Sequence, residues 1–134
     1  MSTTPTQSPH FHIVGVNYIS IYVKDYEAAL AFYSHVLGKP AFQEKTTRGW
    51  SLGNTWLTLF PAKAGTNPTG NPQNMEFAIQ VATPDEVDRL HQAFLDAGAT
   101  DTWTPEDTWM YENMRFGAID DPFGVRIDIY CPLK

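Results

Sequence analysis

An internal repeat is the feature of this sequence that most constrains its fold. Gly38 and Gly98, 60 residues apart, each follow a segment with helical spacing, and Tyr18 and Glu76 lie at equivalent points of the alternating segments before those helices. Each copy has only one predicted helix and about three or four short strands, which is too little to bury its own sheet. The two copies are therefore expected to pack against each other.

The first copy begins with a strand over residues 16–23, where apolar and other residues alternate. The apolar positions then change to a helical period, with Asp25 as the predicted N-cap and Gly38 just past the end of the helix. Two further short segments, residues 46–52 and 55–60, have the composition and alternation of strands.

The second copy repeats this order. A strand over residues 76–81 is followed by Thr83-Pro-Asp-Glu86, which has the form of a capping box with proline in the first turn. Residues 103–115 are expected to form a loop or a short strand. Residues 116–119 and 125–131 are predicted strands, joined by an Asp-Pro-Phe-Gly turn.

Length and composition place both copies in one domain. A chain of 134 residues with 43% hydrophobic and 18% charged residues is typical of a globular protein. We expect a flexible leader over residues 1–10 and a single domain over residues 11–134. Module one spans about residues 11–62, a linker rich in Pro, Gly and Asn spans about 61–74, and module two spans about 75–134.

Charge and cysteine content exclude several classes of function. Nine basic against 15 acidic residues give a net charge of -6, which argues against binding nucleic acid or an anionic membrane. The single cysteine allows neither an intramolecular disulfide nor a cysteine-based metal cluster. Neither a signal peptide nor a long apolar run is visible, so we expect a cytoplasmic protein.

Three segments resemble a known family. Residues 17–25 (NYISIYVKD), 31–38 (AFYSHVLG) and 121–130 (DPFGVRIDIY) resemble the opening and closing motifs of the vicinal-oxygen-chelate superfamily of glyoxalases, bleomycin-resistance proteins and extradiol dioxygenases. The resemblance covers about residues 12–131. It implies an α+β fold of paired βαβββ modules whose strands form a cup, but the superfamily contains isomerases, lyases, dioxygenases, thiol transferases and non-catalytic drug binders.

The resemblance also locates the superfamily's metal-ligand positions, which fall on Tyr18, Thr58, Glu76 and Asp128. The usual ligands at these positions are His or Gln, Glu or His, His, and Glu. Because none of the four is histidine here, and transition metals usually require imidazole together with carboxylate, we expect no tight Zn, Ni or Fe site and no cofactor.

Glu76 and Asp128 remain the main candidate site residues, since each lies on the face of its strand opposite the apolar one. They would contact a cationic ligand group, act as general acid and base, or form a salt bridge with Arg126. If Arg126 turns back toward Asp128, it neutralises the cup; if it points outward, the cup is an anionic site.

Aromatic residues are the second signal. Tyr18, Trp56 and Tyr130 share the face that we expect to line the cup, together with Thr58, although a dimer interface would have the same composition. Trp109 and Tyr111 lie in the stretch before the last two strands, which would either close over a ligand or form a small core patch. His35 and His91 are expected to be surface residues on the helices.

Taken together, these patterns predict a protein that binds a small organic molecule, with a cationic aromatic compound as one candidate, in an acidic, aromatic-lined cup without a catalytic metal. The alternative is a superfamily enzyme, a lyase, isomerase or dioxygenase, that uses Glu76 and Asp128 as base or metal ligands. Because a cup built from two small modules leaves sheet edges and walls exposed, we also expect a homodimer.

Overall fold

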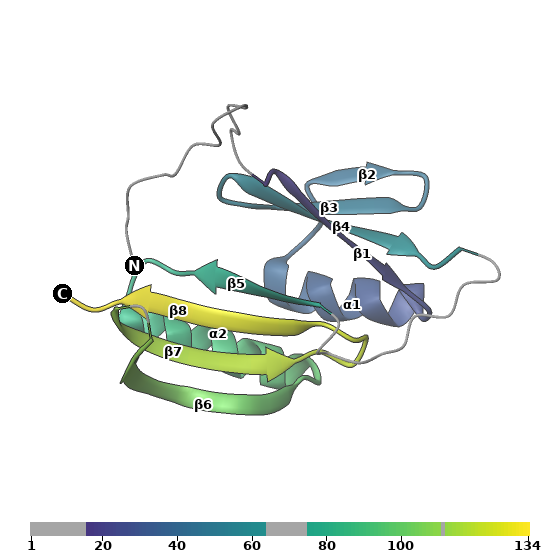
Figure 1. Ribbon diagram of the computed structural model, residues 1–134. Helices are drawn as coiled ribbons and strands as arrows, with labels where there is room; N and C mark the ends of the chain where they lie inside the picture. Colours follow the sequence, from purple (N-terminus) through teal and green to yellow (C-terminus); the bar gives the residue numbers. More distant parts are fainter. Residues whose placement is uncertain (1–15, 64–74, 111) are drawn as a thin grey trace.

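The computed structural model describes residues 16–63, 75–110 and 112–134, and it consists of two βαβββ modules (Figure 1). The expected leader and residues 64–74 of the expected linker lie outside the described residues. Module one contains β1 (Tyr18–Val23), α1 (Tyr26–Leu37), β2 (Phe42–Glu44), β3 (Thr47–Leu52) and β4 (Thr55–Pro61). Module two contains β5 (Glu76–Gln80), α2 (Pro84–Ala97), β6 (Thr100–Trp109), β7 (Asn113–Asp120) and β8 (Arg126–Pro132).

The two modules have the same topology. Their four-stranded sheets have the orders β1-β4-β3-β2 and β5-β8-β7-β6. In each sheet the first strand pairs in parallel with the last, while the other pairs are antiparallel. The predicted α+β architecture of paired βαβββ modules is therefore confirmed.

The predicted helix caps are present in both modules. The Asp25 carboxylate accepts a hydrogen bond from the backbone N–H of Ala28 at 3.1 Å, and the Thr83 hydroxyl accepts one from Glu86 at 3.3 Å. Gly98 ends α2 at a φ of 116°, which is in the left-handed region that glycine adopts without strain. Among the described residues, neither helix is long and apolar enough to cross a membrane.

One core spans both modules. The aliphatic side chains of the strands pack against the helices, and α1 and α2 also contact each other. Phe32 of α1 connects the modules, because its ring centre lies 6.0 Å from that of Phe94 in α2 and 5.6 Å from that of Phe123 in the β7–β8 turn. The expectation that the two copies cover each other's apolar surface agrees with this packing.

The sequence interpretation differs from the structure at residues 103–115. Instead of a loop or short strand, residues 103–109 and 113–115 belong to the long paired strands β6 and β7, and the pairing is irregular on the β6 side. The register between the strands shifts on both sides of Trp103, as expected for a bulged strand. The bulges interrupt the alternation of side chains, which is the signal by which a strand is recognised in a sequence.

A buried hydrogen bond also joins the modules. Tyr33 of α1 is fully buried and donates its hydroxyl to the carboxylate of Asp121, which begins the β7–β8 turn. The other oxygen of Asp121 accepts the backbone N–H groups of Phe123 and Val125, both at 2.8 Å. Burial raises the pKa of both Tyr33 and Asp121, and the hydrogen bonds to Asp121 partly offset the effect on its carboxyl.

Replacing Tyr33 should therefore destabilise the protein more than an equivalent change on the surface of the same helix. Tyr33→Phe removes one of the partners of a buried carboxylate and should lower the free energy of unfolding by about 1–3 kcal/mol in urea titrations. Tyr26→Phe is the matched control, since its hydroxyl donates to the Thr46 carbonyl at an exposed site. Equal losses of stability in the two variants would contradict this prediction.

Candidate functional site

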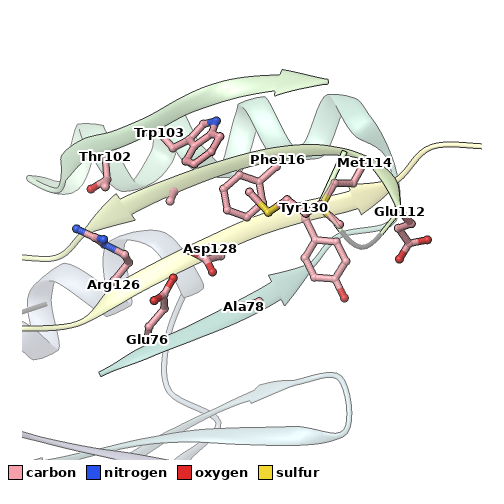
Figure 2. A pocket seen from close by; sticks show the side chains of 12 residues that line it. Glu76, Ala78, Thr102, Trp103, Glu112, Met114, Phe116, Arg126, Asp128 and Tyr130 are labelled. Carbon is pink, nitrogen blue, oxygen red and sulfur yellow. The ribbon is translucent and has the colours of Figure 1, made fainter. Parts of the chain in front are cut away.

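A cavity lies on the face of the module-two sheet opposite α2 (Figure 2). Its volume is about 680 Å³, which is in the range of small-molecule sites. We call it the acidic pocket. It is lined by side chains from β5, β6, β7, β8 and the β6–β7 turn: Glu76, Ala78, Thr102, Trp103, Met110, Glu112, Met114, Phe116, Ala118, Arg126, Asp128 and Tyr130.

Two carboxyl groups lie together at one wall of this pocket. Glu76 comes from β5 and Asp128 from β8, and the parallel pairing of these strands places Asp128 opposite Ala78, two residues from Glu76 (Figure 2). Burial raises the pKa of Asp128 to about 7, and the hydrogen bond and negative charge of Glu76 act in the same direction, while Arg126 opposes them. The pair thus favours a state that retains one proton near neutral pH.

Arg126 follows neither of the two expected alternatives. It lines the acidic pocket, but its guanidinium binds Asp120 of β7 through two hydrogen bonds of 2.8 and 3.1 Å. This contact holds the pKa of the Asp120 carboxyl below its usual value. Because Asp120 already matches the charge of Arg126, the pocket keeps an excess negative charge from Glu112 and from the Glu76–Asp128 pair, which retains one proton near neutral pH.

The opposite wall is aromatic and thioether-rich. Trp103 of β6 and Phe116 of β7 meet edge to face with ring centres 5.1 Å apart (Figure 2). Tyr130 of β8 closes one end and its hydroxyl donates to the Gln80 side chain at 3.2 Å. Met110 and Met114 complete this wall. Phe116 was not among the site residues predicted from the sequence. The predicted strand began at residue 116, whereas β7 begins at Asn113, and in this longer strand Phe116 alternates with Met114 and Ala118 on the pocket face.

The other predicted site residues lie elsewhere. Tyr18, Trp56 and Thr58 line a separate cavity of about 380 Å³ on the equivalent face of module one, which we call the aromatic pocket. Trp109 is 66% exposed at the end of β6 and is absent from the lining of both pockets, and Tyr111 lies outside the described residues. The aromatic pocket has no charged side chain in its lining: Tyr18, Ser20, Phe42, Thr47, Trp56, Thr58 and Phe60.

These positions do not fit a transition metal. Of the four positions that correspond to metal ligands in the superfamily, Glu76 and Asp128 lie in the acidic pocket, whereas Tyr18 and Thr58 lie in the aromatic pocket. The Thr58 hydroxyl is already hydrogen-bonded to Ser20 at 2.7 Å. Over residues 16–63, 75–110 and 112–134, no three His, Cys, Asp or Glu side chains cluster as metal ligands.

Comparison with known families identifies the fold's relatives. The model of the Glyoxalase/Bleomycin resistance protein/Dioxygenase superfamily matches residues 15–129. The chain belongs to this superfamily. The match confirms the resemblance noted in the sequence motifs, and it leaves the activity open because members of one fold carry out many reactions. No curated protein gave a significant match to the chain.

Solved structures agree with this assignment at the level of the fold. A glyoxalase-related enzyme from Fulvimarina pelagi is 22% identical, with a TM-score of 0.72 over 89% of this chain and 88% of that one. A glyoxalase/bleomycin resistance protein from Albidiferax ferrireducens T118 is 17% identical, with a TM-score of 0.71 over 86% and 97%. A family enzyme from Burkholderia phytofirmans PsJN is 24% identical, with a TM-score of 0.64 over 87% and 98%.

The raised pKa of Asp128 predicts a specific pH dependence of stability. The unfolded chain releases this proton near pH 4, whereas the folded chain retains it up to about pH 7. Between these values the folded state binds more protons, so this contribution to stability falls as the pH rises from about 4 to about 7 and is constant above. Asp128→Asn should lack this decline. The melting temperature of the variant minus that of the wild type should therefore increase by roughly 3 °C from pH 5 to pH 8.

Glu76→Gln tests the part of this pKa shift that Glu76 contributes. It removes the neighbouring negative charge but leaves Asp128 able to titrate, so the decline should move to lower pH and become smaller. Parallel melting curves for the wild type and both variants over the same pH range would contradict the assignment.

Proposed function

We propose that this superfamily member binds a small organic molecule that carries a cationic group and a flat apolar part, in the acidic pocket and without a tightly bound transition metal. The observation that carries the proposal is the position of two carboxyl groups, Glu76 and Asp128, opposite the rings of Trp103 and Phe116 in one cavity. We further propose that the protein acts in the cytoplasm.

Charge and shape support this proposal together. The only arginine in the pocket lining, Arg126, is paired with Asp120, and the lining contains no lysine. A ligand cation would therefore meet a net negative charge. Aromatic faces attract cations by about 0.5–2 kcal/mol, depending on their exposure to water, and also stack on flat rings. A cation of moderate size would thus gain attraction from both walls.

A superfamily enzyme, such as a lyase or isomerase, is the second candidate. The observation that favours it is the pKa of Asp128 near 7, because a carboxyl that titrates at neutral pH can accept and return a proton at a bound substrate. In this case Glu76 or Asp128 would be the base. Turnover that disappears in both Glu76→Gln and Asp128→Asn would favour this function over simple binding.

We also propose that the chain forms a homodimer. Within the part of the chain that the structure describes, the face of module one opposite α1 exposes large apolar side chains: Tyr18 is 66% exposed, Tyr22 49% and Phe42 43%. The ring of Tyr22 stacks on that of Phe60, with ring centres 5.1 Å apart, and this contact extends the exposed surface beyond the aromatic pocket. An exposed aromatic face of this kind is typical of a contact surface, and a second copy is the partner that is always present.

Ligand preference can be measured with a permanent cation. Benzyltrimethylammonium should raise the melting temperature of the wild type, whereas benzoate should not, because a ligand that binds only the folded state stabilises it. The Glu76→Gln/Asp128→Asn double variant should lose the response. Asp85→Asn/Asp96→Asn is the matched control, since it removes two carboxylates from the exposed face of α2. Stabilisation by benzoate alone, or an unchanged response in the double variant, would contradict the proposal.

The oligomeric state can be measured independently. Light scattering at micromolar concentration should give about twice the chain mass of 15.1 kDa. Tyr22→Glu/Phe42→Glu should shift the protein toward the monomer, because it buries two charges in the proposed contact. Glu27→Gln, on the exposed surface of α1, is a control that should leave the dimer intact. A monomeric wild type would contradict the prediction.

A further inference from the structure

The wall of the acidic pocket depends on an irregularity in β6. Thr102 and Trp103 are consecutive residues, yet both line the pocket (Figure 2). In a regular strand, consecutive side chains point to opposite faces of the sheet. The register shifts between Asp101 and Trp103 and between Trp103 and Glu106 account for the difference, since a bulge redirects the side chains beside it.

A buried histidine lies beneath this bulge, on the opposite side of the sheet from the pocket. His91 of α2 is only 4% exposed, so the expectation that it is a surface residue is wrong. Its Nε2 lies 3.1 Å from a carboxylate oxygen of Asp101, and the other oxygen of Asp101 accepts the hydroxyl of Thr104 at 2.6 Å. Because an ionised carboxylate only accepts, Nε2 is the protonated nitrogen.

Close packing holds the histidine against the same segment. A methyl group in place of the Gly117 hydrogen on β7 would lie 3.0 Å from the Pro105 ring, 3.1 Å from the Trp103 carbonyl oxygen and 3.3 Å from the His91 ring. The bulge, the histidine and the β7 backbone therefore meet without spare room. On the pocket side, the Thr102 side chain helps to lower the pKa of Asp120, the partner of Arg126.

We infer that His91 is a positioning residue of the acidic pocket: through its hydrogen bond to Asp101 it holds the β6 bulge that turns Trp103 toward the carboxyl pair. Without this bond, the Asp101 carboxylate keeps only the Thr104 hydroxyl, and the bulge loses one of its attachments to α2. The indole of Trp103 is 39% exposed, and its Nε1 is held by Glu106 of the same strand at 2.8 Å. A shift of the bulge would therefore move the indole relative to Phe116 of β7, on which it packs.

The role of His91 can be tested without a ligand. In protein labelled with 5-fluorotryptophan, the ¹⁹F resonance of Trp103 is assigned as the signal missing from Trp103→Phe. His91→Leu removes the donor and should shift or broaden this resonance, while His91→Gln, which retains an N–H donor, should restore it toward the wild-type position. Asp101→Ala removes the acceptor at a partly exposed site and should have the same effect. It replaces His91→Leu in the experiment if that variant folds poorly.

Val87→Ala is the control for general destabilisation. Val87 is fully buried on the same helix, so its truncation should lower stability while leaving the Trp103 resonance in place. An unchanged resonance in both His91→Leu and Asp101→Ala, or an equal shift in Val87→Ala, would overturn the inference.

The effect on binding rests on the proposed function. His91→Leu and Asp101→Ala should weaken the affinity for benzyltrimethylammonium by about two- to fivefold, as expected for the loss of one cation–π contact at a partly exposed site. Unchanged affinity in both variants would overturn the link between His91 and the ligand. If the probe does not bind the wild type, the proposed function fails, and the ¹⁹F comparison still decides whether His91 positions Trp103.

Discussion

The hydrogen bond between Tyr33 and Asp121 connects the two modules through buried polar groups. It joins α1 of one module to the turn of the other, inside the same core that Phe32, Phe94 and Phe123 occupy. The same aspartate accepts two backbone N–H groups of that turn, so it also sets the direction in which β8 begins. Arg126 and Asp128 follow within seven residues of Asp121, and thus the acidic pocket is built on this turn.

Two copies of one architecture have produced two chemically different surfaces. In both modules the aliphatic face of the sheet packs on a helix and the opposite face is hollowed. Equivalent strand positions carry Tyr18 and Thr58 in module one but Glu76 and Asp128 in module two. The core face is aliphatic in both modules, whereas the second face forms a neutral aromatic pocket on one sheet and an acidic pocket on the other.

Irregularity separates the two pockets further. The hairpin of module one is short, with a three-residue β2, whereas β6 has ten residues and two register shifts. A regular β6 would send Thr102 and Trp103 to opposite faces, and the acidic pocket would lose part of its aromatic wall. The buried contact of His91 with Asp101 thus connects the packing of α2 to the shape of a surface on the other side of the sheet.

The sequence by itself determined the repeat, both helices with their caps at Asp25 and Thr83, and the face of each regular strand, because these follow from local periods and local hydrogen bonds. It could not show that Tyr18 and Thr58 lie apart from Glu76 and Asp128, since that depends on how the modules pack. It also could not show that Arg126 binds Asp120, or that His91 is buried beneath a bulge. The first contact depends on the register of the β7–β8 hairpin, and the second joins a helix to a strand with no shared period, so only the tertiary structure decided them.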